Sequence, residues 1–438
     1  MDNFDQRTVT GDRLRTSVPV MNSDPAFMLL GQSGGKREYV PISEDILEKH
    51  ILMIGGIGTG KTNLFNSMIR SIRNVMNSND IMVIFDTKGD FYREFYTEGD
   101  IVISNDEKAC GPHGEDYWNI FNEVTADDRV EENIREIANV LFDERLNRTS
   151  QPFFPSAARD LFYALLLHYI RLGDAAAKYR DNEFLRYSLD QCTSDAFLLL
   201  LQRHPDLRAL SSYIQDSRSE QTLGVMSELQ QITRDILVGN FKKKGSLSMR
   251  HLIRESSRKV IFIEYDLGLG ETLTPVYKLL IDLAIKEVLS RNTAESTQKR
   301  NVYFILDEFR LLPKLKYIDS GVNFGRSLGA KFIAGIQNVG QVEAAYGSEM
   351  AQSVLSGFGT MISFRVRDAK TREYIKSVYG KNLLMRTYVS AVSSKGISEQ
   401  LAEGNVIEDH DITNLRTGEA IVGFPAEEPF LIRFNKYK

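Results

Sequence analysis

The amino-acid sequence predicts an α/β protein in which a mainly parallel sheet is interrupted by an all-α segment. Short apolar runs, typical of strands covered on both faces, recur before about residue 124 and after about residue 250. Between these two regions, apolar residues follow the helical period instead. One apolar run leads directly into a glycine-rich turn and a helix. Strands that alternate with helices in this way favour one parallel sheet.

The bulk composition is that of an ordinary globular protein. The chain has 438 residues and a formal net charge of −5, and its length allows two or three domains. This charge argues against a surface coated with basic residues for duplex DNA, although a ring can confine positive charge to its channel. The two cysteines and six histidines form no zinc or disulfide pattern, which indicates a reducing, cytosolic setting. No signal peptide is visible, and no apolar run reaches the roughly 20 residues of a membrane span, so we expect a cytoplasmic protein.

The expected elements follow the chain in order. Apolar runs predict strands at residues 26–30, 38–42, 51–54, 81–85, 101–103, 260–263, 302–306, 332–337 and 361–364, and a final hairpin within 420–435. Helical periodicity predicts helices at residues 63–75, 131–143, 157–172, 221–238 and 276–290. We therefore expect a lead-in with short strands over 1–45, an α/β domain over 46–124 and 251–438, and an all-α inserted domain over 125–250.

The glycine-rich turn has the pattern of a phosphate-binding loop, G-x-x-x-x-G-K-[ST]. Its glycines allow backbone N–H groups to surround phosphate oxygens, and the helix that follows adds a favourable dipole. Lys61 is expected to reach the β- and γ-phosphates and Thr62 to hold Mg²⁺. The predicted ligands of ATP and Mg²⁺ in this loop are Gly55, Gly56, Ile57, Gly58, Thr59, Gly60, Lys61, Thr62 and Asn63.

An acidic pair follows the apolar run at 302–306. Asp307 is expected to bind Mg²⁺, and Glu308 to orient and polarise the water that attacks the γ-phosphate. An apolar run that ends in Asp-Glu is weak evidence alone. Together with the phosphate-binding loop, it predicts an ATPase rather than a passive nucleotide binder.

Two further residues are candidates for a catalytic role. Gln337 ends the next strand, where an amide can sense the γ-phosphate, although a capping amide is the alternative. Arg326, expected on the preceding helix, could reach the nucleotide of a neighbouring subunit as an arginine finger. Arg365 and Arg367 compete for that role, and a surface salt bridge is the alternative for each arginine.

Three other features have a structural and a functional interpretation. The segment 86–90 follows a predicted strand and could face a ligand or form a solvated turn. We interpret His168, on an apolar helical face, as a packed residue rather than a metal ligand. The basic triplet 242–244 is interpreted as a solvated loop, with a phosphate contact as the alternative.

Taken together, these motifs resemble the conjugative coupling proteins of type IV secretion, from about residue 40 to the C-terminus. The phosphate-binding loop and the acidic pair are generic, whereas the Asp-Thr-Lys-Gly and Leu-Pro-Lys-Leu segments and the place of the helical insert are more specific. The resemblance rests on residues 55–62, 86–90, 118–122, 153–159, 222–225, 306–309, 312–315, 325–326, 335–337 and 346–347.

The resemblance implies a RecA-like motor domain with an all-helical domain that helps to engage substrate. Family members are hexameric, DNA-dependent ATPases that pass single-stranded DNA or protein through a central channel. It therefore implies a homo-oligomer, and partners that include single-stranded DNA or a relaxase–DNA complex and components of the secretion channel. Arg326 matches the family's trans-acting arginine and Gln337 its glutamine, while Lys61, Thr62, Asp307 and Glu308 match its nucleotide ligands and hydrolytic pair.

This sequence departs from the family pattern in three places. The family usually begins with transmembrane helices, so we expect either a truncated chain or a soluble relative, cytoplasmic or at the inner membrane if an anchor or membrane partner exists. Members usually carry Pro at the position of Thr87, and Gly-Asn at Arg310-Leu311. Two other functions stay open: a soluble duplex-DNA pump of the FtsK/HerA type, and a nucleotide-gated module that docks substrate.

Overall fold

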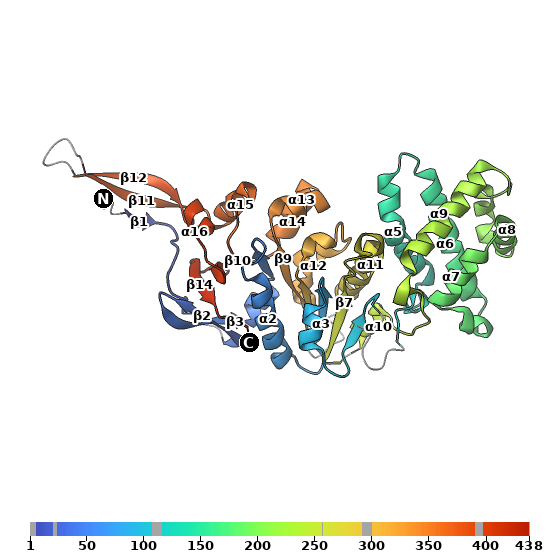
Figure 1. The fold of residues 1–438 in the computed structure, drawn as a ribbon, viewed down its shortest axis with the longest axis horizontal. Coiled ribbons are helices and arrows are strands. Elements are labelled where there is room, and N and C mark those ends of the chain that lie inside the picture. Colours follow the sequence, from blue (N-terminus) through green and yellow to red (C-terminus); the bar gives the residue numbers. More distant parts are fainter. Residues whose placement is uncertain are drawn as a thin grey trace. The chain divides into compact units, whose positions relative to one another are not determined.

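The computed structural model describes residues 6–20, 24–106, 116–255, 257–290, 300–389 and 397–437. The chain divides into two compact units (Figure 1). The first unit comprises Met1–Met82, Thr293–Lys314 and Ile318–Lys438, and the second comprises Val83–Asn292 and Leu315–Tyr317. Among the described residues, none of the helices combines the length and the hydropathy that a bilayer crossing requires.

The first unit is built on a sheet with a parallel centre. Its strands pair in the order β3-β2-β14-β13-β10-β4-β9-β8, and β10, β4, β9 and β8 are parallel to one another. Every residue of these four strands is buried, which explains their largely apolar sequences. Their bounds are β4 (Ile51–Ile54), β8 (Val302–Leu306), β9 (Ala330–Ile336) and β10 (Thr360–Ser363).

Antiparallel strands extend the sheet beyond β10. The predicted C-terminal hairpin is present, because β13 pairs with both β10 and β14, and β14 then pairs with β2 of the β2–β3 hairpin. The bounds are β2 (Pro25–Ser33), β3 (Lys36–Ser43), β13 (Glu419–Gly423) and β14 (Phe430–Phe434). The β2–β3 hairpin and the C-terminal hairpin therefore belong to the same sheet as β4, the strand that precedes the phosphate-binding loop.

Helices connect the strands of the first unit. Helix α2 follows β4 and buries Leu64, Met68 and Ile72 at helical spacing, as the sequence predicts. The bounds of the helices are α1 (Glu44–Glu48), α2 (Lys61–Val75), α12 (Ile318–Phe324), α13 (Val339–Tyr346), α14 (Ser348–Ser356), α15 (Ala369–Tyr379) and α16 (Asp409–Thr413). Two 3₁₀ turns, η4 (Phe309–Leu311) and η5 (Gly325–Leu328), flank α12.

A second, three-stranded sheet in this unit was not predicted. Strand β11 (Lys381–Val389) pairs antiparallel with both β1 (Gln6–Thr10) and β12 (Ile397–Asn405). The sequences of β1 and β12 are largely polar, and the apolar residues of β11 are interrupted by polar ones, so these strands lack the apolar signal that identifies a buried strand.

The second unit begins within β5 (Ile81–Asp86), and its strands pair in the order β5-β7-β6. Strands β6 (Ile101–Ile103) and β7 (Lys259–Glu264) are parallel. Helix α3 (Asp90–Phe95) follows β5, and α11 (Gly270–Leu289) follows β7.

Between β6 and β7, every described element is helical. The elements are α4 (Ile120–Val124), α5 (Val130–Arg148), α6 (Phe153–Arg171), η1 (Asp174–Tyr179), α7 (Asn182–Gln191), α8 (Ser194–Gln202), η2 (Pro205–Tyr213), α9 (Glu220–Ile236), η3 (Gly239–Lys242) and α10 (Met249–Arg254). The compact units are divided inside β5 and not at the ends of this helical run. The division into a motor domain and an inserted domain over 125–250 thus stays a prediction.

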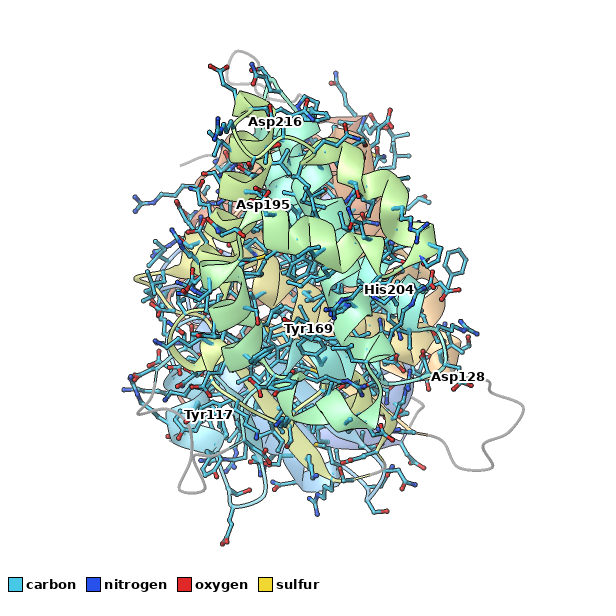
Figure 2. All side chains as sticks on the ribbon, turned by 90° about the vertical axis from the view of Figure 1, so that its right-hand side faces the viewer. Tyr117, Asp128, Tyr169, Asp195, His204 and Asp216 are labelled. Carbon is cyan, nitrogen blue, oxygen red and sulfur yellow. The ribbon has the colours of Figure 1, made fainter. Side chains whose placement is uncertain are left out.

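Polar side chains inside the helical run are paired with one another. His168 on α6 is buried, and its Nδ1 lies 2.8 Å from Nε2 of His204, one of the residues marked in Figure 2. Burial lowers the pKa of His168 to about 4, with help from the neighbouring His204. Among the described residues, no cluster of His, Cys, Asp and Glu could hold a metal ion. His168 is therefore a packed residue of the helical core.

A buried arginine joins α10 to α5 and α11. The Arg250 side chain donates to Glu136 at 2.6 Å and to Glu287 at 3.1 Å, and all three side chains are buried. Glu123 accepts hydrogen bonds from the backbone N–H of Arg250 at 3.2 Å and from the Trp118 indole at 2.9 Å. Charges this deep are tolerated because each has a partner.

Candidate nucleotide-binding site

The phosphate-binding loop connects β4 to α2, as predicted. Gly58 and Gly60 have φ values of +71° and +119°, a region that favours glycine. A Cβ on Gly60 would also lie 3.1 Å from Gly418, whereas a Cβ on Gly58 would meet nothing within 4 Å. The space above Gly58 is therefore open for a ligand, while Gly60 is required by the backbone itself.

The loop is held by its neighbours in the sheet. Thr59 donates from Oγ1 to the Gly56 carbonyl at 2.8 Å, and its own carbonyl accepts from Gly418 N at 2.8 Å. The Gly55 N–H donates to Ile336 O, at the end of β9, at 3.1 Å. These bonds fix the loop before any ligand contributes, which is the pre-organisation that a phosphate site needs.

The three residues after Gly60 differ in what their side chains do. The Lys61 ammonium donates to the carbonyls of Gly55 and Gly56, the latter at 3.2 Å. Thr62 is half-buried at the start of α2. The Asn63 side chain donates to Asn435 O at 2.8 Å and accepts from Tyr437 N at 2.7 Å. Asn63 could therefore contact a phosphate through its backbone N–H, because its side chain already binds the C-terminal segment.

The acidic pair lies at the same edge of the sheet as the loop. Strand β9 is parallel to β4 on one side and to β8 on the other, so the carboxyl ends of all three strands coincide. Asp307 directly follows β8, and its carbonyl would lie 2.3 Å from a Cβ on Gly335. A glycine at position 335 is what lets the backbone of Asp307 approach β9 so closely.

Glu308 and Gln337, which the sequence suggested separately, form one hydrogen-bonded pair. The Gln337 amide donates from Nε2 to Glu308 Oε2 at 2.8 Å. The other oxygen, Oε1, accepts from Arg310 Nε at 3.0 Å. The carboxylate of Glu308 is thus held from both sides. The pairing of Arg310 with Glu308 was not predicted, because nothing in the sequence of a turn indicates where the side chain two residues further on points.

Arg326 lies on the 3₁₀ turn η5, directly after α12, and not on the helix itself as expected. Its guanidinium is half-exposed and forms ion pairs with two carboxylates of α1, Asp45 at 2.9 Å and Glu48 at 3.7 Å. A salt bridge was the alternative interpretation of this arginine, and the structure contains it. The role of Arg326 at the nucleotide of a neighbouring subunit therefore stays a prediction.

The segment after β5 is a folded turn of the second unit. Asp86 is buried, and its carboxylate accepts from the backbone of Lys88 at 3.2 Å and of Tyr92 at 2.8 Å. Burial raises the pKa of Asp86. A cavity of about 350 Å³ beside it is lined by Lys88 and Glu264, among others. Burial also raises the pKa of Glu264, and Asp86 adds to the effect.

The donor set at the first unit's sheet edge fits a nucleotide with Mg²⁺. A hydroxyl at Thr62 and a carboxylate at Asp307 are the hard oxygen ligands that Mg²⁺ prefers. The open space at Gly58 and the first N–H groups of α2 suit the phosphates. The fit to the nucleotide rests on the backbone conformation of the loop and of the strand ends, which the structure has without a ligand.

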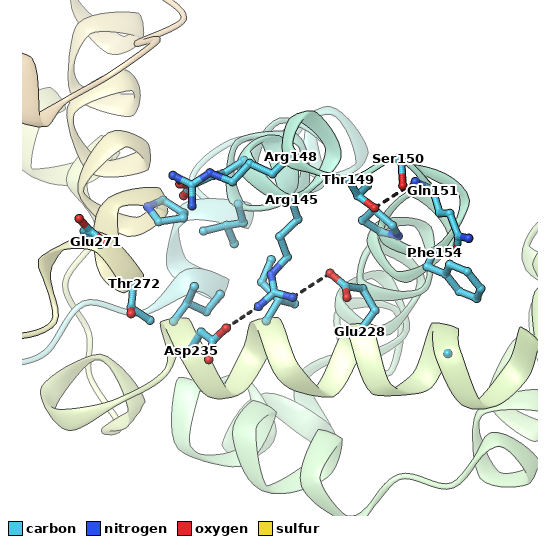
Figure 3. A pocket seen from close by; sticks show the side chains of 17 residues that line it. Arg145, Arg148, Thr149, Ser150, Gln151, Phe154, Glu228, Asp235, Glu271 and Thr272 are labelled. Atoms are coloured by element: carbon cyan, nitrogen blue, oxygen red, sulfur yellow. Dashed lines mark hydrogen bonds and ion pairs between the residues drawn. The ribbon is translucent and has the colours of Figure 1, made fainter. Parts of the chain in front are cut away.

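A second cavity, of about 710 Å³, lies among the helices of the second unit (Figure 3). Helices α5, α6, α9 and α11 contribute its lining. Arg145 projects across it and donates to Glu228 at 2.9 Å and to Asp235. Arg148 forms an ion pair with Glu144 at 2.5 Å. The cationic groups of this cavity are therefore neutralised by its own acids.

Comparison with known proteins gives a consistent result. Coupling protein TraD of Escherichia coli (strain K12) is 23% identical over an alignment of 465 residues, gaps included. This alignment covers 99% of this chain and 59% of that protein. The chain thus spans less than two thirds of that relative. The structure of the plasmid coupling protein TrwB with the ATP analogue ADPNP has a TM-score of 0.75 at 20% identity, and covers 100% of this chain and 96% of TrwB. TrwB in complex with ADP and Mg²⁺ has a TM-score of 0.73 at 20% identity over the same shares of both chains.

These likenesses confirm the predicted α/β fold class and the resemblance to coupling proteins. Residues 37–433 match the family described as the type IV secretion-system coupling protein DNA-binding domain. Because that match covers most of the 438 residues, the chain belongs to the type IV secretion-system coupling protein family.

Proposed function

We propose that this chain is an ATP-hydrolysing motor subunit that moves DNA, or a nucleoprotein substrate, towards a type IV secretion channel. The observation that carries the proposal is the position of β9 between β4 and β8. It brings the phosphate-binding loop and the acidic pair to one edge of the first unit's sheet. Family membership and the nucleotide complexes of TrwB support the same function.

The residues of the loop bind the phosphates of ATP. Lys61 exchanges its bonds to the loop carbonyls for the β- and γ-phosphate oxygens of ATP. The backbone N–H groups from Gly58 to Asn63 surround the phosphates. Thr62 and Asp307 hold Mg²⁺, which supplies a positive charge that polarises the phosphate oxygens.

Glu308 takes the chemical step. Its carboxylate orients the attacking water and accepts a proton from it. The bond from the water oxygen to the γ-phosphorus forms while the bond from the γ-phosphorus to the β–γ bridging oxygen breaks, and that oxygen leaves with ADP. Gln337 donates a hydrogen bond to Glu308 Oε2 and directly follows β9. A change at Glu308 after loss of the γ-phosphate can therefore be transmitted to this strand. Gln337 is therefore a positioning residue for Glu308.

Assembly into a ring, with a hexamer as the active form, completes the proposal. In a ring, Arg326 leaves Asp45 and Glu48 and stabilises the charge that develops at a neighbour's nucleotide. The helical run of the second unit engages the cargo, which is single-stranded DNA or a relaxase–DNA complex. Channel components of the secretion system are the further partners.

The test is the ATPase rate measured against protein concentration, with and without single-stranded DNA. We expect a rate per subunit that rises with concentration and is stimulated more by single-stranded than by duplex DNA, in a salt-sensitive manner. Stronger stimulation by duplex DNA would favour a soluble duplex pump. A rate that is already maximal in dilute monomers would contradict the trans role of Arg326.

Two variants locate the chemistry. We expect Glu308→Gln to bind ATP but to lose about 10²–10⁴-fold in turnover, because the amide cannot accept the proton. Arg326→Ala should bind nucleotide normally and regain turnover when mixed with Glu308→Gln, since each supplies what the other lacks. A Glu308→Gln protein that still transfers DNA in cells would favour a docking module over a motor.

A further inference from the structure

A cavity of about 480 Å³ adjoins the phosphate-binding loop on the side of the C-terminal segment. This volume lies within the range of about 300–1,000 Å³ that is usual for small-molecule sites. Its lining belongs entirely to the first unit and comes from the start of α2, the turn before β13, the end of β14 and one residue of β2. The residues that the argument uses are Gln32, Gly60, Asn63, Gly418, Arg433 and Phe434.

The C-terminal wall of this cavity is attached directly to the loop. Asn63 exchanges hydrogen bonds with Asn435 O at 2.8 Å and Tyr437 N at 2.7 Å, and Gly418 N donates to Thr59 O at 2.8 Å. In Figure 1 the C-terminal end of the chain accordingly lies beside α2. The wall is therefore fixed relative to the phosphate-binding loop, although more than 350 residues separate the two in sequence.

The position of the cavity suits the part of a nucleotide that follows its phosphates. Phosphates held by a loop of this type contact the glycine turn and the first N–H groups of the helix. The nucleoside must then continue past the residues at the start of α2, and Gly60 and Asn63 line the cavity at that point. Phe434 lines the cavity, is buried and packs against Phe364 with ring centroids 6.4 Å apart, so an aromatic side chain forms part of the cavity wall.

Arg433 provides a planar cation at the mouth of the cavity. It is exposed on β14, directly opposite Gln32 of β2 and Glu419 of β13. Within the described part of the chain it forms neither a side-chain hydrogen bond nor an ion pair, in contrast to Arg310 and Arg326. A guanidinium group that is not engaged elsewhere can stack on an aromatic ring.

We propose that this cavity holds the base and ribose of the nucleoside triphosphate, with the Arg433 guanidinium stacked on the base. The proposal rests on the proposed function, because it assigns the remainder of the ligand whose phosphates the loop binds. Stacking reads the face of a ring and not its edge, so Arg433 strengthens binding of every base and selects weakly among them.

The experiment compares two ligands that share their phosphates. Binding of ADP and of inorganic pyrophosphate to the full chain is measured by calorimetry, for the wild type and for Arg433→Ala, Arg433→Lys and Lys61→Ala. Arg37→Ala, an exposed arginine on the neighbouring β3, is the matched control. We expect the wild type to bind ADP more tightly than pyrophosphate, and Arg433→Ala to weaken ADP about tenfold with pyrophosphate unchanged.

Each other outcome overturns a defined claim. If Arg433→Ala leaves ADP binding unchanged, or weakens both ligands equally, the nucleoside does not lie against Arg433. If Arg433→Lys restores ADP binding fully, the contribution is charge and not stacking. In either case, the proposed function is still supported if the wild type binds both ligands and Lys61→Ala binds neither. A wild type that binds neither ligand overturns the proposed function and this inference together.

Discussion

Lys61 of the first unit and two arginines of the second unit differ in the groups to which they donate. In the first unit, Lys61 donates to two neutral carbonyls of its own loop, bonds that a phosphate oxygen can replace with a gain in charge attraction. In the second, Arg145 lies between Glu228 and Asp235, and the buried Arg250 is matched by Glu136 and Glu287. A cation already paired with carboxylates has little to gain from an anionic ligand.

This difference explains why cavity size does not identify the nucleotide site. The cavity of about 710 Å³ in the second unit is larger than that of about 480 Å³ at the phosphate-binding loop. The smaller one adjoins exchangeable donors and open backbone N–H groups. Variants at the phosphate-binding loop should therefore change kinetics, whereas variants at the buried ion pairs of the second unit should change stability.

The largest expected effect is that of Lys61→Ala. Loss of the ammonium removes a donor that binds the developing charge, so we expect turnover to fall at least about 10²-fold, below detection in an ordinary phosphate-release assay. Arg145→Ala is the matched control from the larger cavity, and its turnover per subunit should stay within about twofold of the wild type. Normal hydrolysis by Lys61→Ala would remove the central claim.

The next effect concerns stability and belongs to the second unit. Arg250→Leu removes the cation that Glu136 and Glu287 share, but Glu136 keeps Lys286 at 2.6 Å and Glu287 keeps Arg254 at 2.7 Å. The loss of these charge-assisted hydrogen bonds should cost about 1.5–3 kcal/mol in the free energy of unfolding. Trp118 is the only tryptophan in the sequence and is buried in this unit, so its fluorescence during urea unfolding reports this change. Arg148→Leu, whose ion pair is exposed, should change stability by less than about 1 kcal/mol. Equal effects of the two substitutions would contradict the distinction.

A pH effect of similar size is expected in the first unit. Burial, together with the charges of Arg326 and Lys331, lowers the pKa of His50 to about 4. The unfolded chain therefore binds a proton that the folded chain refuses between about pH 6.5 and pH 4. Stability should fall as the pH is lowered through this range, by up to about 3 kcal/mol.

Circular dichroism melts at pH 7 and pH 4.5 measure this loss. His50→Asn, which keeps an acceptor for the Phe332 N–H, should lose less stability between the two pH values than the wild type. If both proteins lose the same amount, the acid sensitivity arises elsewhere, and His168 of the second unit is the next candidate.

The smallest effect is that of Arg310→Ala. Its ion pair with Glu308 is partly exposed, so it contributes at most about 1 kcal/mol. Release of Glu308 Oε1 from a competing donor should raise kcat about two- to fivefold and leave the KM for ATP unchanged. Arg310→Lys, which keeps the charge, should behave more like the wild type. A tenfold fall in kcat would instead make Arg310 a positioning residue.

Much of the site could be predicted from the sequence because its signals are local. The glycine turn before Lys61 and the apolar run before Asp307 each lie within a dozen consecutive residues. Both were assigned correctly to strand ends, and the helical run between β6 and β7 was recognised from its period. The polar strand β12 and the mixed sequence of β11 gave no such signal, and both strands were missed.

What the sequence determined by itself was the identity and order of the local elements, because hydrophobic period and turn chemistry act over neighbouring residues. Only the tertiary structure decided which of them meet. It joined Gln337 to Glu308, directed Arg326 onto α1, and set the C-terminal segment beside Asn63. These contacts depend on the order in which strands pair, and strand order is decided by packing of the whole sheet rather than by any one segment.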